Sequence, residues 1–137
     1  MIKYFHKKQL KAFTLSELLI VLVILGILVL LALPNLLPLI SKAKSTEAQL
    51  QLSHLYTLEK SYFYAHSKYT ANLNEISFEP VKLVAEGGQA NYQIEVIEAG
   101  NSGFKARATS TVDFDADGIF NVWEIDQENN LLEVTPD

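Results

Sequence analysis

Cysteine is absent from this chain of 137 residues, so no disulfide bond stabilises its fold. Positive charge is absent from the C-terminal part, because residues 108–137 contain eight acidic side chains and neither lysine nor arginine. The net charge of −5 becomes −9 without residues 1–12, which hold four lysines and no acidic residue. Such an acidic chain repels nucleic acids, and we expect no nucleic-acid partner.

The sequence also lacks the residue patterns of catalytic sites. Its three histidines, His6, His54 and His66, are not spaced as metal ligands on one turn of a helix. No glycine-rich phosphate loop occurs. We therefore expect that the chain is not an enzyme and that it needs no cofactor, a candidate calcium ion apart.

A further absence is that of charge from residues 18–40, a run of 23 positions. A helix of about 20 apolar residues crosses the hydrocarbon core of a bilayer. Lys7, Lys8 and Lys11 precede the run and favour a cytoplasmic N-terminus. A secretory signal would have a shorter apolar region and a small-residue cleavage site, whereas this run ends in Pro-Asn-Leu-Leu-Pro. The pattern predicts a single membrane-spanning helix.

One carboxylate, Glu17, lies at the N-terminal border of the apolar run, four residues after Phe13. An acidic side chain in a spanning helix costs about 2–3 kcal/mol on insertion scales, so Glu17 is expected to have a partner.

The segment KAFTLSELLIVLVILGILVLLALPNLL, residues 11–37, resembles the N-terminal signature of type IV pilins and type II secretion pseudopilins. The resemblance implies cleavage by a prepilin peptidase between Ala12 and Phe13, methylation of the new amine of Phe13, and an assembly role for Glu17. Gly26 and Pro34 match a glycine and a proline that interrupt the helix in this family. The family usually has glycine before the cut, where this chain has Ala12, and a small residue should still fit the peptidase.

The same resemblance implies a structural subunit of a type IV pilus or pseudopilus, which polymerises with other pilins through its N-terminal helix. Its implied partners are the prepilin peptidase, an inner-membrane assembly platform and the membrane. Its implied location is the inner membrane before assembly and a periplasmic or extracellular filament afterwards. In the filament, the amine of Phe13 could meet Glu17 of a neighbouring subunit. The alternative is a monomeric, membrane-anchored acidic binding module.

We predict three regions, namely a leader (1–12), an apolar transmembrane or filament-core helix (13–40) and a globular domain (41–137). One helix is expected from Phe13 to about His66, with kinks at Pro34 and Pro38 and local melting between Gly26 and Pro34. Its second half carries an apolar stripe at spacings of three and four, formed by Ala48, Leu52, Leu55, Tyr56, Tyr62 and Phe63.

After this helix, residues 67–80 are rich in Asn, Ser and Thr and predict a loop. Alternating residues and turn signals then predict five antiparallel strands: 81–85, 92–98, 104–112, 120–125 and 131–135. The fold class is therefore α+β, with one long helix packed on a small antiparallel sheet, as in pilins.

The segment Asp113–Glu124 has the spacing of an EF-hand calcium loop. Asp113, Asp115 and Asp117 would be the main ligands and Gly118 would permit the turn, while Asn121 and Glu124 occupy the ninth and twelfth positions. The flanking segments predict strands instead of the two helices of an EF-hand. The alternative is an acidic turn in which the aspartates accept hydrogen bonds from their own backbone.

Overall fold

The computed structural model describes residues 12–136, and the predicted leader therefore lies outside the described residues except for Ala12. The chain forms two compact units, one ending at Asn35 and the other beginning at Leu36. A single helix, α1 (Leu15–His66), contributes to both units. The structure confirms the long helix and places its start two residues after the expected Phe13.

The predicted local melting between Gly26 and Pro34 is wrong, because α1 is helical without interruption from Leu15 to His66. A proline removes only its own N–H from the helical ladder, so a helix with good formers on both sides tolerates it. Beside Pro34, the side-chain Nδ2 of Asn35 donates to the carbonyl of Leu31 at 3.4 Å, which gives this carbonyl a side-chain donor.

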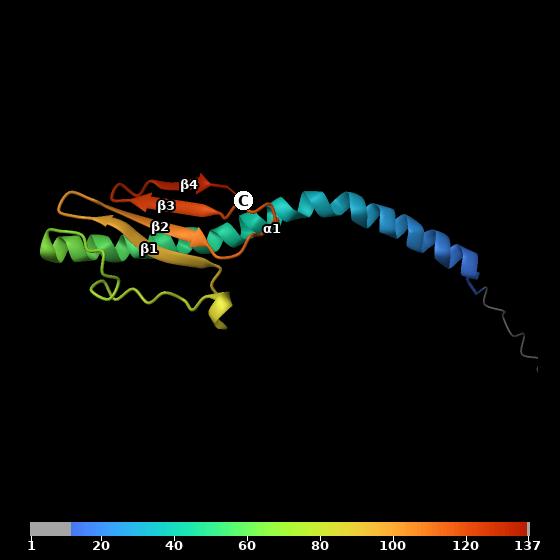
Figure 1. Cartoon of the computed structure of the whole chain (residues 1–137), viewed down its shortest axis with the longest axis horizontal. Coiled ribbons are helices and arrows are strands. Elements are labelled where there is room, and N and C mark those ends of the chain that lie inside the picture. Colours follow the sequence, from blue (N-terminus) through green and yellow to red (C-terminus); the bar gives the residue numbers. More distant parts are fainter. Residues whose placement is uncertain (1–11, 137) are drawn as a thin grey trace, which may run out of the picture. The chain divides into compact units, whose positions relative to one another are not determined.

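The second unit contains a sheet of four antiparallel strands, which lie in the order β1, β2, β3, β4 (Figure 1). The bounds are Tyr92–Ala99 for β1, Phe104–Ser110 for β2, Val122–Asp126 for β3 and Leu131–Thr135 for β4. Each strand pairs with the next along the chain, and the register shifts once in β1 and once at the start of β3. These four strands confirm the predicted α+β class and four of the five predicted segments.

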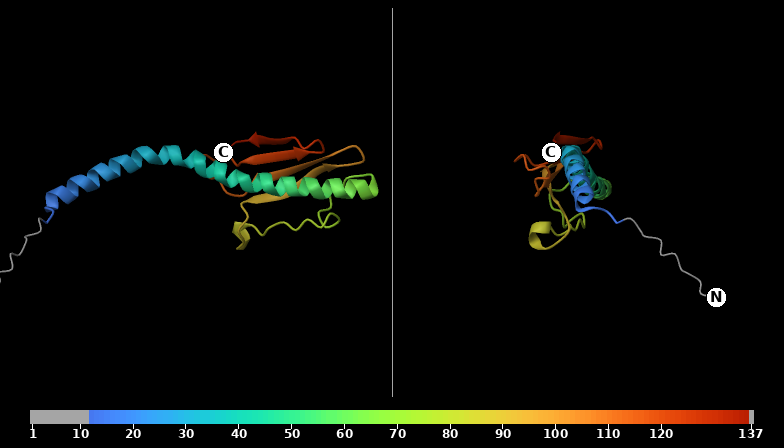
Figure 2. Two further views of the ribbon diagram at one scale, coloured as in Figure 1. Left: turned by 180° about the vertical axis from the view of Figure 1, so that it is seen from behind. Right: turned by 90° about the vertical axis from the view of Figure 1, so that its right-hand side faces the viewer.

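The core lies between this sheet and the part of α1 that follows residue 40, which runs along one face of the sheet (Figure 2). The predicted stripe is confirmed, because Ala48, Leu52 and Leu55 are fully buried and the three aromatic residues pack against them. The buried apolar residues of the sheet include Tyr92, Ile94, Phe104, Ala106, Ala108 and Ile125. Along β2 every second residue is buried, and the buried row consists of Phe104 and the small residues Ala106, Ala108 and Ser110.

The predicted strand at residues 81–85 is wrong. The chain instead forms a short 3-10 helix, η1 (Val84–Glu86), and Leu83 makes only an isolated bridge with Ala90. The reason is the turn at Gly87-Gly88, where Gly87 has a φ of 81° and a Cβ at Gly88 would clash with the carbonyl of Lys82. The turn folds the segment onto itself, so its backbone does not extend the sheet.

Candidate functional site

The helix begins with a reciprocal pair of hydrogen bonds between Thr14 and Glu17. The carboxylate Oε2 of Glu17 accepts from the backbone N–H of Thr14 at 2.8 Å and from its hydroxyl at 2.9 Å. The backbone N–H of Glu17 donates to the Thr14 hydroxyl at 3.3 Å. This is a capping box, which satisfies two N–H groups that the first turn of a helix leaves unpaired.

The single chain thus already provides a partner for Glu17, in its own helix cap. The signal is visible in the sequence as Thr-Leu-Ser-Glu directly before the apolar run, although it is not included in the expectations above. Phe13 precedes the cap and its side chain is 86% exposed. The cap fixes where the helix begins, and Phe13 and Ala12 are left outside it.

The apolar side chains between Leu18 and Ile40 face solvent in the isolated chain. Every leucine, isoleucine and valine from Leu18 to Ile40 is between 38% and 70% exposed. By length and composition, α1 can cross a membrane. Side chains of this kind on all sides of a helix need an apolar environment, which a lipid bilayer or neighbouring helices supply.

The predicted calcium ligands Asp113, Asp115 and Asp117 lie together in the loop between β2 and β3. One carboxylate oxygen of each lies within 4.8 Å of the others. The backbone holds them there: Asp113 accepts from the N–H groups of Ala116 at 2.7 Å and Gly118 at 2.8 Å, and Asp117 accepts from Ile119 at 2.7 Å. Ala116 and Gly118 both have positive φ, which turns successive N–H groups toward the carboxylates.

Asn121 and Glu124 do not join this group. Asn121 is fully buried, accepts from the Tyr92 hydroxyl at 2.8 Å and donates to Glu133 at 2.7 Å. Glu124 pairs with Arg107 on the neighbouring strand, at 2.7 Å between Oε1 and the guanidinium. The sequence spacing suggests a calcium ligand at each position. In the structure Asn121, just before β3, bonds to Tyr92 and Glu133, and Glu124 lies opposite Arg107 in the sheet.

The three aspartates fit a cation in their spacing. Two oxygens that each lie about 2.4 Å from a calcium ion are at most about 4.8 Å apart. The N–H groups of the loop, led by that of Gly118, hold the pKa of Asp113 below its usual value, so this carboxyl is ionised at neutral pH. These hydrogen bonds from the loop N–H groups are expected both for a calcium loop and for the alternative, an acidic turn that caps its own backbone.

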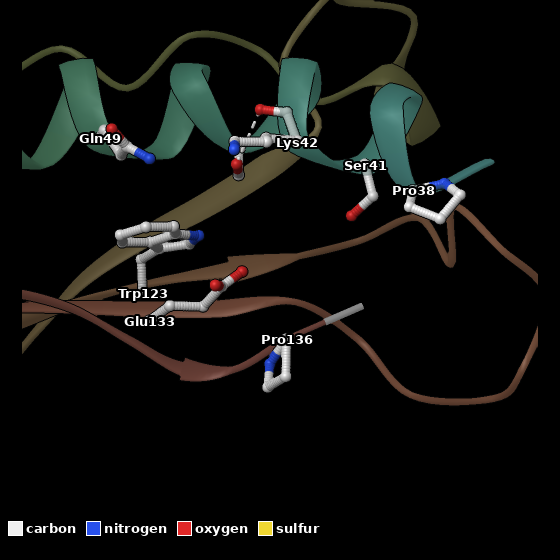
Figure 3. A pocket seen from close by; sticks show the side chains of 8 residues that line it. Pro38, Ser41, Lys42, Gln49, Trp123, Glu133 and Pro136 are labelled. Atoms are coloured by element: carbon white, nitrogen blue, oxygen red, sulfur yellow. Dashed lines mark hydrogen bonds between the residues drawn. The ribbon is translucent and has the colours of Figure 1, made fainter. Parts of the chain in front are cut away.

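A separate pocket of about 280 Å³ lies between α1 and strands β3 and β4. Figure 3 shows Lys42 and Gln49 of the helix on one side and Trp123 and Glu133 of the sheet on the other. The indole N–H of Trp123 is buried and has no partner among the described residues 12–136. The pocket combines one cation, one anion, one side-chain amide and two hydroxyl groups, which does not specify a single class of ligand.

Two comparisons with known proteins bear on this arrangement. Residues 7–33 match the family described as the prokaryotic N-terminal methylation motif. The chain is also 38% identical over 84 residues to the type IV major pilin protein PilA of Myxococcus xanthus (strain DK1622), which covers 61% of this chain. The chain spans about a third of the length of that relative, since the match covers 36% of it.

The matched motif includes the border between Ala12 and Phe13, the capping box and most of the exposed apolar segment. The second unit adds the helix-on-sheet arrangement expected of this class. The chain thus carries the prokaryotic N-terminal methylation motif and is similar over 84 residues to a type IV major pilin.

Proposed function

We propose that this chain is a structural subunit of a type IV pilus or a related pseudopilus, made as a membrane-held precursor and polymerised through its apolar helix. The similarity to a major pilin favours the pilus of the two. The proposed partners are other pilin subunits, a prepilin peptidase and an inner-membrane assembly platform. The proposed location is the inner membrane before assembly, with the N-terminus in the cytoplasm, and the filament afterwards.

The observation that carries the proposal is the capped start of an apolar helical segment, residues 18–40, whose side chains no other part of the described chain covers. Every large apolar side chain of residues 18–40 is exposed, so a second apolar surface must cover this segment. A bilayer serves the stored monomer, and the same segments of neighbouring subunits serve the filament. When a subunit moves from the bilayer into the filament, its apolar segment exchanges one apolar environment for another. Burial of apolar surface alone therefore does not determine how the subunits align.

Glu17 supplies that alignment in our proposal. In the monomer its carboxylate is occupied by Thr14. In an apolar filament core, a cleaved Phe13 amine of the neighbouring subunit would add a charge-assisted bond to the same carboxylate. A subunit inserted at a wrong axial step would leave this carboxylate with its Thr14 hydrogen bonds but without a counter-charge, which costs several kcal/mol in apolar surroundings.

Replacing Glu17 by Gln tests the function, since it removes the charge and keeps the shape and one acceptor. We expect the variant to remain in the membrane fraction at the wild-type level and to lose surface filaments, measured by shearing and electron microscopy. Glu79→Gln is the matched control, because Glu79 is an exposed glutamate of the outer loop. Normal filaments that contain the Glu17→Gln chain would refute the alignment role of Glu17, whereas wild-type filaments that do not contain this chain would favour the alternative, a monomeric membrane-anchored acidic binding module.

The proposed processing site has a separate test. Intact mass spectrometry of the mature protein should show a chain that starts at Phe13 and carries one added methyl group. A mature chain that begins at any other residue would remove the amine on which the pairing with Glu17 rests.

We further propose that Asp113, Asp115 and Asp117 bind a calcium ion. The support is the spacing of their carboxylate oxygens and the positive φ of Ala116 and Gly118, whose N–H groups donate to Asp113. Water and backbone carbonyls would complete the coordination, as in other calcium sites. Bound calcium would link the end of β2 to the start of β3 in a chain that has no cysteine.

A further inference from the structure

Glu59 is a glutamate in the interior of the second unit. It lies on α1 and is 0% exposed, in the same row as the core residues Leu52 and Leu55. Glutamate is almost never fully buried unless its charge is paired. The side chain therefore needs a physical account that core packing does not give.

Only one oxygen of the Glu59 carboxyl group is paired. Oε2 accepts from the backbone N–H of Thr70 at 3.2 Å, which links α1 to the loop that follows it. Oε1 has no hydrogen-bond partner among the described residues 12–136. An ionised carboxylate with a single N–H donor is poorly compensated in a low-dielectric interior, whereas a neutral carboxyl group leaves only one O–H unpaired.

The cations nearby are engaged with other groups. Lys60 is the next residue of α1, but its ammonium donates to the Tyr69 hydroxyl at 3.2 Å and lies over the rings of Tyr56 and Tyr69. The charge of Lys68, in the loop, acts on Glu75 and helps to lower its pKa. The β2 residues that face the helix are Phe104, Ala106 and Ala108, none of which titrates.

A second carboxylate, Glu75, faces Glu59 across Thr70. The hydroxyl of Thr70 donates to Glu75 at 2.8 Å, while the Thr70 N–H donates to Glu59. The Tyr62 hydroxyl donates to Glu75 as well, at 2.9 Å. The hydrogen bonds from Thr70 and Tyr62 lower the pKa of Glu75, so it is ionised at neutral pH and adds a like charge beside Glu59.

These surroundings shift the pKa values of Glu59 and Glu75 in opposite directions. Burial raises the pKa of Glu59 most, the Thr70 N–H lowers it, and the charge of Glu75 raises it again. Two titratable groups whose environments act in opposite directions form an arrangement that responds to pH. Glu59, the carboxyl group that resists ionisation, accepts the hydrogen bond from Thr70 in the loop that follows α1.

We propose that Glu59 is a pH-dependent latch, which is neutral and fastens residues 67–80 to α1 in acidic surroundings and ionises and releases them as the pH rises. The fastened segment contributes Tyr69, Ile76 and Phe78 to the core. The N–H of Tyr69 also bonds to the carbonyl of Gly100 in the turn between β1 and β2, at 2.9 Å. Release of residues 67–80 would therefore loosen one end of the second unit.

The sign follows from linkage. The folded state binds the Glu59 proton more tightly than the unfolded state, so the contribution is fully present below the ordinary glutamate value of 4.5. It is lost as the pH rises through the raised folded-state pKa. Within that window, each pH unit lowers the folding equilibrium constant by about tenfold relative to a variant that does not titrate there.

Carbon-13 NMR of the glutamate carboxyl groups tests the latch in the full chain in detergent micelles. The Glu59 signal is assigned by its loss in Glu59→Gln. We expect its titration midpoint above that of every other glutamate in the wild type, and at lower pH in Glu75→Gln, which removes the neighbouring charge. A Glu59 midpoint at or below 4.5 in the wild type would overturn the proposal.

A second measurement reports on the fastened segment itself. Hydrogen exchange at the Thr70 amide is compared in the wild type and Glu59→Gln, where glutamine keeps the acceptor oxygen and carries no charge. We expect the ratio of the two rates to increase with pH above about pH 4.5, with faster exchange in the wild type. Glu79→Gln is the control and should give a ratio to the wild type that does not change with pH. A constant ratio for Glu59→Gln between pH 4 and pH 8 would exclude the latch.

Discussion

The two parts of helix α1 differ in where they find their partners. Residues 18–40 are the most apolar part of the chain, and every one of their large side chains is exposed. Residues 41–66 are much more polar, yet they contain all six residues of the helix that are buried: Ser41, Ser45, Ala48, Leu52, Leu55 and Glu59. Apolar character alone therefore does not determine burial within this chain.

The difference lies in what the rest of the sequence offers to each part. The four strands present one apolar face, and a single stripe of the helix covers it. A helix that is apolar on all sides needs an apolar environment on all sides, which one small sheet does not supply. The first part is therefore expected to depend on contacts outside the chain, and the second part on contacts within it.

The largest effect should come from truncating a side chain that depends on internal contacts. Leu52→Ala removes a fully buried side chain of the core and should lower the free energy of unfolding of the second unit by about 2–5 kcal/mol. Leu28→Ala is the matched control, because Leu28 is 56% exposed in the apolar part of the same helix.

Denaturant unfolding of the full chain in micelles, followed by the fluorescence of the single tryptophan, Trp123, measures both variants. Leu28→Ala should change the free energy of unfolding by less than about 0.5 kcal/mol. Equal losses from the two substitutions would mean that the two parts of the helix are not energetically distinct.

A polar residue within the second unit should have the next largest effect. Asn121 is fully buried, accepts from Tyr92 and donates to Glu133 and to the carbonyl of Thr135 at 3.0 Å. Asn121→Ala leaves buried polar partners unsatisfied and should cost about 2–3 kcal/mol. Asn101→Ala, in the exposed turn between β1 and β2, is the control and should cost little. A small loss at Asn121 would show that water replaces the amide.

These cases show how far sequence patterns lead in this chain. The apolar stripe of α1 and the alternation in β1 predict the core, because helical and strand periodicities are local properties. The burial of Glu59 has no such signal, because it depends on the loop that brings Thr70 over the helix. The segment 81–85 has strand-like residues, but the turn at Gly87-Gly88 closes it before it can pair.

The candidate sites divide in the same way. The three aspartates are predicted from their spacing along a few residues, and the structure brings them together, whereas the hydrogen bonds between Thr14 and Glu17 are not among the predictions. Asn121 and Glu124 occupy the right spacing for calcium ligands, but they have other partners in the structure. Spacing within one turn or loop is therefore informative here, whereas spacing that extends into a strand is not.

The acidic loop is the part of the second unit that, like the apolar helix, is expected to need a partner from outside. If Asp113, Asp115 and Asp117 bind calcium with a Kd near 1 mM, several millimolar calcium should stabilise the fold by about 1 kcal/mol. For a unit of this size the melting temperature should rise by about 4–8 °C.

Thermal melts of the full chain in micelles, in calcium and then in chelator, measure this shift. Magnesium at the same concentration controls for ionic strength. Asp115→Asn combined with Asp117→Asn should abolish the calcium effect. A wild-type chain whose melting temperature is the same in calcium and in chelator would leave the loop as a self-capped acidic turn.

The smallest effect is expected at the partly exposed ion pair between Arg107 and Glu124, which lie directly opposite each other on β2 and β3. The guanidinium Nε and one terminal nitrogen both donate to the same carboxylate oxygen, at 2.9 and 2.7 Å. The arginine side chain is 38% exposed, so water and salt screen the attraction. Arg107→Ala should therefore lower the free energy of unfolding by only about 0.2–1 kcal/mol, and less in high salt.

This substitution also sharpens the assignment of the calcium ligands, because it frees the Glu124 carboxylate. If Asp113, Asp115 and Asp117 bind calcium without Glu124, as the structure favours, the calcium-induced rise in melting temperature should be the same in Arg107→Ala and in the wild type. If Glu124 is the twelfth-position ligand, the loss of its competing partner should strengthen calcium binding and increase the rise. Thr109→Ala, two residues along β2, is the control for a change on the same face of the sheet. A larger calcium-induced rise in melting temperature in Arg107→Ala alone would identify Glu124 as a calcium ligand. It would also show that the ion pair with Arg107 competes with the metal for this carboxylate.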